Sequence, residues 1–148
     1  MKKTILTLLM LFATLQAGEY KAIFDCSSSD ANYIKTRMWL IDKTISMIQE
    51  KGEKTNFVLT LNGGCVPMVS KFFLDIIPDE DIADIKKAQD YLHTLATKKD
   101  VKVIACAMSL KRNLIKQKDV LDFVKISPNS YIDTIKYQND GYAIMTFK

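Results

Sequence analysis

The chemistry that this sequence can support is concentrated at three cysteines, Cys26, Cys65 and Cys106, which lie about forty residues apart. That spacing is typical of one strand–helix–strand unit, and each cysteine lies at or just beyond the end of an apolar segment that is typical of a strand. Because the carboxyl ends of parallel strands meet at one edge of a sheet, we expect all three cysteines at the same edge. A thiol there can act as a nucleophile, although cysteines also end buried strands simply because they pack well.

The segment 101–112, VKVIACAMSLKR, makes Cys106 the strongest candidate. Residues 101–105 are nearly all apolar, which is typical of a strand covered on both faces. Ser109 is then expected to cap a short helix whose first turn carries Lys111 and Arg112. The helix dipole and the two bases would favour thiolate over thiol, and the bases could bind an anion. The alternative for Lys111 and Arg112 is a solvated basic face.

A second loop is expected near Cys106. It follows the strand predicted at 56–61 and consists of Asn62, Gly63, Gly64 and Cys65. Adjacent glycines allow a sharp turn and a close approach to a ligand, but the loop matches neither GxGxxG nor a P-loop. We assign Asn62, Gly63 and Gly64 to substrate binding, together with Ser109 from the first segment, and Cys65 is the candidate resolving thiol.

Cys26, which follows the first predicted strand, would complete the site as a further substrate-binding residue. An odd number of cysteines leaves at least one thiol outside any intramolecular disulfide. A disulfide between two of the three stays open at this point.

Metal-dependent and hydrolytic chemistry fit the sequence poorly. The cysteines form no CxxC pair, and the one histidine, His93, is expected to be a surface or half-buried residue of a helix. Structural zinc sites bring ligands in close pairs, while a Ser-His-Asp triad or a thioredoxin-like site needs partners that are missing here. We therefore expect no metal and no cofactor.

The first 17 residues are typical of a secretory signal peptide. Lys2 and Lys3 precede an uncharged apolar run over 5–15, which is too short to span a bilayer, and Ala17 supplies a small residue at the cleavage site. This predicts a periplasmic protein, with a mature chain of residues 18–148 that forms one domain without a membrane segment. An uncleaved anchor is the alternative. The 21 basic and 17 acidic residues are interspersed, which does not indicate nucleic-acid binding.

Strand and helix patterns alternate along the mature chain. Strands are expected at 20–24, 56–61, 101–105, 122–126 and 142–147, and helical segments begin after Asp30, Pro67, Pro78, Ser109 and Pro128. This order predicts a three-layer α/β fold with a mostly parallel five-stranded sheet flanked by helices.

The first helix carries one long apolar stripe, formed by Ile34, Met38, Ile41, Ile45 and Ile48. Gly52 is expected to end this helix. Trp39, Leu40 and Met47 lie off the stripe, which predicts that another copy of the chain covers that face.

Together these segments resemble the exported branch of the DsrE/DsrF-like sulfur-relay family. The resemblance rests on FDCSSSD after the first strand, LTLNGG after the second, ACAMSLKR after the third, and GYA in the last. It implies a parallel five-stranded sheet, assembly as a homotrimer or hexamer, and a cysteine that carries sulfur as a persulfide, which here is Cys106. Exported relatives often have a histidine where this chain has Asn62, so any acid–base role of that histidine is absent.

Two functions stay open. In the first, Cys106 accepts sulfane sulfur from a donor and passes it to the thiol of a partner protein, with Cys65 as resolving thiol. In the second, the protein is a non-catalytic oligomeric module that binds a small anion or a partner, and its cysteines only pack. Reactivity of the Cys106 thiol separates the two.

Overall fold

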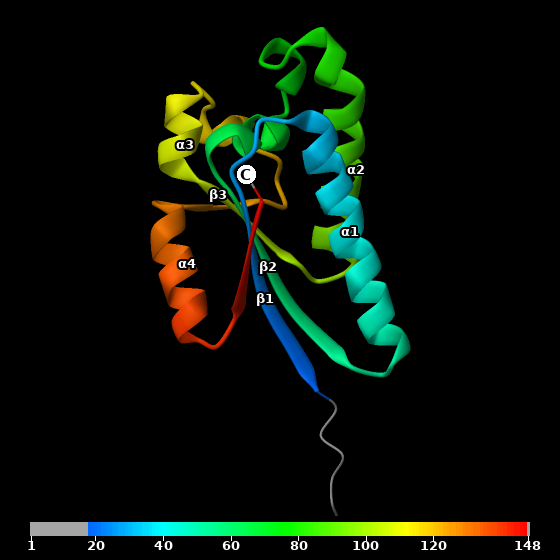
Figure 1. Cartoon of the computed structure of the whole chain (residues 1–148). Helices are drawn as coiled ribbons and strands as arrows, with labels where there is room; N and C mark the ends of the chain where they lie inside the picture. Colours follow the sequence, from blue (N-terminus) through cyan, green and yellow to red (C-terminus); the bar gives the residue numbers. More distant parts are fainter. Residues whose placement is uncertain (1–17, 148) are drawn as a thin grey trace, which may run out of the picture.

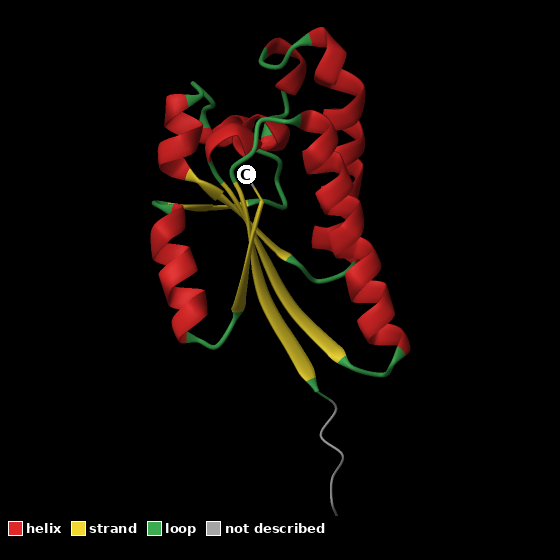
Figure 2. Cartoon of the chain, in the orientation of Figure 1, coloured by secondary structure: helices red, strands yellow, loops and turns green. Residues whose placement is uncertain are grey.

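The computed structural model describes residues 18–147, which form a twisted five-stranded sheet with helices on both sides (Figures 1 and 2). The strands are β1 (Glu19–Cys26), β2 (Lys54–Leu61), β3 (Lys102–Cys106), β4 (Lys125–Ser127) and β5 (Ala143–Phe147). Their order is β4-β3-β2-β1-β5, and every neighbouring pair is parallel. The predicted α/β fold with a parallel five-stranded sheet is confirmed.

The helices divide between the two faces of the sheet. They are α1 (Ala31–Glu50), α2 (Ile82–Lys98), α3 (Ala107–Arg112) and α4 (Ser130–Asn139). In Figure 1, α1 and α2 lie side by side on one face, whereas α3 and α4 lie on the other side of the sheet. Short 3₁₀ turns complete the chain: η1 (Gly63–Val69), η2 (Phe73–Asp75), η3 (Asp79–Asp81) and η4 (Gln117–Asp119).

Helix α1 forms as its apolar stripe and its cap predict. The Asp30 carboxylate accepts a hydrogen bond from the Tyr33 backbone N–H at 2.8 Å, which satisfies one free donor of the first turn. Four stripe residues are buried, Ile34, Met38, Ile41 and Ile45, and Ile48 is partly buried. Each fully buried side chain of this size contributes about 1.5–3 kcal/mol, so packing rather than helix propensity holds α1 in place. Gly52, with φ of +76°, follows the helix as expected.

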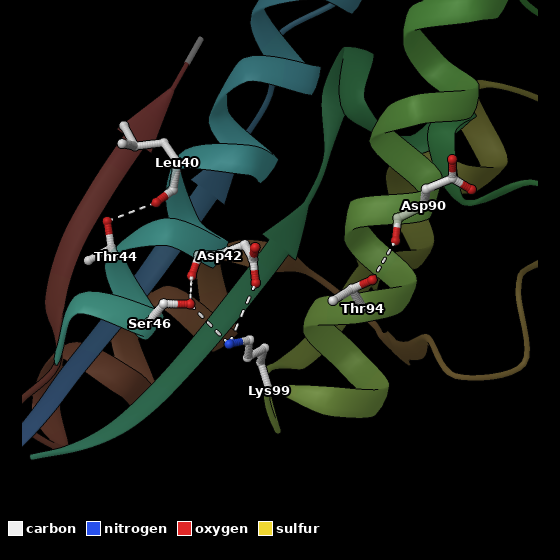
Figure 3. A network of polar contacts seen from close by, with 7 residues as sticks. All are labelled: Leu40, Asp42, Thr44, Ser46, Asp90, Thr94 and Lys99. Atoms are coloured by element: carbon white, nitrogen blue, oxygen red, sulfur yellow. Dashed lines mark hydrogen bonds and ion pairs between the residues drawn. The ribbon is translucent and has the colours of Figure 1, made fainter. Parts of the chain in front are cut away.

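Polar contacts fix α1 against α2 on the solvent side. Lys99, just after α2, donates to the Ser46 hydroxyl at 3.1 Å and lies 3.9 Å from the Asp42 carboxylate (Figure 3). At the other end of the pair, Lys35 and Asp84 form an ion pair at 2.5 Å. These contacts link the two helices, whose buried faces cover the main core.

Strand alternation assigns each residue of the sheet edge to one face. Leu59 and Leu61 of β2 and Val103 and Ala105 of β3 belong to the core under α1 and α2. The residues between them point the other way, and Ile104 belongs to the smaller cluster under α4.

Several predicted boundaries move. Strand β4 begins at Lys125 rather than at 122, and β1 and β2 are longer than expected. The helix expected to begin after Ser109 instead begins at Ala107, with Cys106 as its N-cap. The predicted signal peptide lies outside the described residues. Within those residues, no helix is both long and apolar enough to cross a bilayer.

Candidate functional site at the carboxyl edge of the sheet

The three cysteines lie at the carboxyl edge of the sheet, as predicted, but on different faces. Cys26 is the last residue of β1, Cys65 lies in η1 just after β2, and Cys106 is the last residue of β3. Cys26 and Cys65 belong to the core under α1 and α2. Because side chains alternate along a strand, Cys106 shares the face of Ile104, which is the face that α4 covers. The sheet therefore separates Cys106 from the other two.

Cys26 and Cys65 form a disulfide, with their Cα atoms 5.9 Å apart. This separation is typical of disulfides in proteins. Both residues are completely buried, and the bond leaves Cys106 as the free cysteine of residues 18–147. While this bond is intact Cys65 has no free thiol, so the resolving role predicted for Cys65 would require its reduction. Cys26 is likewise fully buried in the core under α1 and α2.

Cys106 is buried, with 4% of its surface exposed, and it is the N-cap residue of α3. Burial raises the pKa of this thiol, but the backbone N–H groups of Ser109, Ser130 and Met108, together with the Ser109 hydroxyl, more than offset that effect. The net result is a pKa below the ordinary thiol value. These donors come from the first turns of α3 and α4. A lowered pKa increases the thiolate fraction near neutral pH, and the thiolate is the nucleophile.

Ser109 acts differently from the helix cap that its sequence context predicts. It is the third residue of α3, and its Oγ accepts a hydrogen bond from the Gly63 backbone N–H at 3.0 Å. An oxygen that accepts this bond still has its own proton to donate, and the Ser109 hydroxyl is one of the groups that lower the pKa of Cys106.

Lys111 and Arg112 do not belong to the thiolate environment. They occupy the last turn of α3, not its first, and both are exposed. Positive charge at this end complements the negative pole of the helix, so their position has a structural explanation. The expected first-turn position of the two bases is not found, because α3 begins at Ala107 rather than after Ser109, and their role in binding an anion stays a prediction.

The loop that contains Asn62, Gly63 and Gly64 positions the site. Leu61 of β2 pairs with Ala105 of β3. Asn62 and Cys106 follow these two residues, so they lie next to each other at the ends of the two neighbouring strands. The Asn62 side chain donates to the Asp25 carboxylate at 2.7 Å. Gly63 has φ of +50°, and a Cβ on Gly64 would lie 2.8 Å from the Ser28 backbone, so both glycines are required by the close approach of the loops.

Two residues of this region were missed by sequence analysis. The Asp25 carboxylate also accepts from the Thr60 hydroxyl at 2.8 Å, which ties β1 to β2. The Asn113 side chain donates to the Ser109 carbonyl at 2.9 Å and to the Gly63 carbonyl at 3.4 Å. Alternation along β1 could have placed Asp25 on the Cys106 face, but Asn113 carried no signal because its partner is distant in sequence.

The expectation for His93 is supported. Its side chain is exposed on α2, where its ring meets Phe123 edge-on with centroids 5.5 Å apart. Among the described residues, no group of three or more His, Cys, Asp or Glu side chains lies close enough to hold a metal ion.

Comparison with known proteins places the chain in a family. The DsrE/DsrF-like family model matches residues 21–147. An uncharacterized protein of Aquifex aeolicus (strain VF5) is 37% identical over 147 residues, which cover 99% of this chain but only 64% of that protein. The structure of a protein of unknown function, MTH1491 from Methanobacterium thermoautotrophicum, superposes with a TM-score of 0.59 at 16% identity, covering 86% of this chain and 99% of that one. The structural likeness supports the fold, and the matched family model shows that the chain belongs to the DsrE/DsrF-like family.

Proposed function

We propose that this protein is a periplasmic sulfur carrier that holds sulfane sulfur as a persulfide on Cys106. Membership of the DsrE/DsrF-like family suggests sulfur relay at the level of the family. The observation that carries the proposal to a residue is the free Cys106 thiol, whose pKa is lowered by donors from two helix starts. A purely structural cysteine needs no such donors.

The proposed reaction consists of two displacements at sulfur. In the first, the Cys106 thiolate attacks a sulfane sulfur of an inorganic polysulfide, and the S–S bond of the donor breaks. The leaving fragment departs as sulfide or a shorter polysulfide with the bonding electron pair, and Cys106 is left as a persulfide anion. No external oxidant is required, because the sulfane sulfur already carries the oxidation level that the persulfide needs.

In the second displacement, the thiolate of a partner protein attacks the outer sulfur of that persulfide. The bond between this sulfur and Cys106 Sγ breaks, which regenerates the Cys106 thiolate and leaves the partner as a persulfide. The disulfide already occupies Cys65. We therefore infer a carrier with one reactive thiol that delivers sulfur to another protein rather than to its own second cysteine.

The disulfide also bears on the proposed location. Stable disulfides between buried cysteines are typical of oxidising compartments and rare in the cytosol. The Cys26–Cys65 bond therefore supports the proposal of a periplasmic protein, alongside the signal-peptide pattern at residues 1–17.

We further propose that the chain assembles as a homotrimer or hexamer. Trp39, Leu40 and Met47 on α1 are 42%, 42% and 63% exposed. Leu40 and Met47 line a largely apolar groove of about 700 Å³ between α1 and the edge strand β5. A second copy of the chain would remove this apolar surface from water. Size-exclusion chromatography with light scattering tests this proposal, and a purely monomeric protein would contradict it.

The experiment that tests the sulfur-carrier proposal is intact mass spectrometry of the purified protein, residues 18–148, before and after exposure to polysulfide. We expect the mass to increase by one sulfur atom or a few, the increase to be reversed by a thiol reductant, and peptide mapping to place it on Cys106. The matched control is Cys106→Ser, which keeps the disulfide and should gain nothing. If Cys106→Ser gains as much sulfur as the natural chain, the proposal is wrong, and the non-catalytic binding module becomes the better account.

A further inference from the structure

Hydrogen bonds and the disulfide tie the loops that follow β1 and β2 to one another, and the second loop also contacts α3. On the β1 side, the Asn62 N–H donates to the Cys26 carbonyl at 2.8 Å, and the Gly64 N–H donates to the Ser27 carbonyl at 3.1 Å. The Cys26–Cys65 bond connects the same two loops covalently. The loop at 62–65 is therefore held against the end of β1 on both sides of its glycines.

The same loop contacts α3 through Gly63. Its N–H donates to Ser109 Oγ at 3.0 Å, and its carbonyl accepts from the Asn113 side chain at 3.4 Å. Asn113 also binds the Ser109 carbonyl at 2.9 Å. Gly63 thus connects the disulfide-bonded loop to the start of α3, where Cys106 is the N-cap and Ser109 the third residue, two positions whose side chains lie close together in helices.

Ser109 does not make the hydrogen bond that is commonest among the helical Ser and Thr hydroxyls of the described chain, and Ser130 and Thr134 of α4 do not make it either. The side chains of five others donate to the carbonyl four residues earlier: Thr36, Thr44, Ser46, Thr94 and Thr97. Figure 3 shows three of these bonds, at Thr44, Ser46 and Thr94. Ser109 is only the third residue of α3, so the carbonyl four residues earlier belongs to Ala105 in β3. The hydrogen bond that the Ser109 oxygen makes is instead with Gly63, a residue outside its own helix.

We propose that the Cys26–Cys65 disulfide is a positioning element for Cys106, acting through Gly63 and the Ser109 hydroxyl across the sheet. The inference deepens the proposed function, since it concerns what controls the sulfur-carrying thiol. With the bond intact, Gly63 occupies one lone pair of Ser109 Oγ and leaves the proton for the Cys106 sulfur. Without the bond, the loop is held by hydrogen bonds alone, and Ser109 loses the partner that orients it.

The test is the pH profile of iodoacetamide alkylation of Cys106 in a cycle of four proteins: the natural chain, Cys26→Ala/Cys65→Ala, Ser109→Ala, and the combination of all three changes. We expect removal of the disulfide to shift the profile to higher pH and to slow alkylation at pH 7 by roughly threefold to tenfold. Ser109→Ala should have a similar effect. In the Ser109→Ala background, loss of the disulfide should cause no further shift, because the path through Ser109 is already cut.

Two further variants keep the test decisive. Asn113→Ala retains the disulfide and loosens Gly63 from α3, so it should shift the profile in the same direction even if the disulfide variants fail to fold. Thr94→Ala removes a helical hydroxyl that is remote from Cys106 in the fold and should leave the profile unchanged. Additive shifts in the cycle, or an unshifted profile for Asn113→Ala, would overturn the proposal.

This readout is separate from sulfur loading. If the natural chain shows the coupled pH profiles but takes up no sulfur from polysulfide, the proposed function fails while the positioning role stands. If Cys106 takes up sulfur normally but the disulfide and Ser109 variants shift the pH profile of alkylation additively, only the positioning role fails.

Discussion

Replacing both Cys26 and Cys65 with alanine should lower the free energy of unfolding by about 4 kcal/mol. The two cysteines are 39 residues apart in the sequence. In the chain-entropy model, a crosslink that closes a loop of this length removes about 13 cal/mol/K of entropy from the unfolded chain, or about 4 kcal/mol at 25 °C. A single domain of this size typically has about 5–15 kcal/mol of stability in total, so the variant should keep a folded state but with a small margin.

Urea denaturation followed by circular dichroism measures this change. With a dependence on urea of about 1–3 kcal/mol/M, the unfolding midpoint should fall by roughly 2 M. The natural chain in strong reductant should approach the midpoint of the alanine variant once its disulfide is reduced, which non-reducing mass analysis verifies. The control is Cys106→Ala, which removes a cysteine side chain without opening the loop and should cost much less.

The reasoning would be refuted by a loss below about 1 kcal/mol in the alanine variant, since the closed loop would then contribute almost nothing. It would also be refuted if the oxidised natural chain contained three free thiols by mass after alkylation under denaturing conditions.

Three shorter predictions complete the set. Because the donors around Cys106 lower its pKa, its alkylation rate should reach its plateau at a lower pH than that of a model thiol such as glutathione; a plateau at the same pH would contradict this. Gly64→Ala should destabilise the fold by about 1–3 kcal/mol in urea titrations, because its Cβ would lie 2.8 Å from the Ser28 backbone, and an unchanged midpoint would show that the loops yield freely. Lys35→Ala should cost only about 0.2–1 kcal/mol, with the loss shrinking in high salt, because its ion pair with Asp84 is partly exposed to solvent; a loss above 2 kcal/mol would indicate a contribution beyond the ion pair.

Local patterns were sufficient for most of the fold. The spacing of Ile34, Met38, Ile41 and Ile45 predicts a helix with one buried stripe, and the structure confirms it. Alternation of strand and helix patterns predicts a parallel sheet because parallel neighbours need a crossover connection. These features depend on residues close together in the chain, so a single sequence displays them.

Local sequence patterns predicted the wrong first residue for α3. Serine is a strong N-cap, and the residues after Ser109 suit a helix, so local preference predicts a start at that residue. In the fold the chain leaves β3 at Cys106 and enters α3 directly. The Ser109 hydroxyl is then free to accept from Gly63, a residue 46 positions away. This contact between α3 and a residue distant in sequence cannot be seen in the local pattern around Ser109.

The sequence by itself determined that three cysteines lie at the carboxyl edge of a parallel sheet, because each is found at or just after the end of an apolar strand. Only the tertiary structure decided which of them pair. Side chains alternate between the faces of a sheet, so Cys26 meets Cys65 under α1, while Cys106 lies on the opposite face beside the first turns of α3 and α4. The face of each residue depends on where its strand begins and on its register with its neighbours, which long-range packing sets.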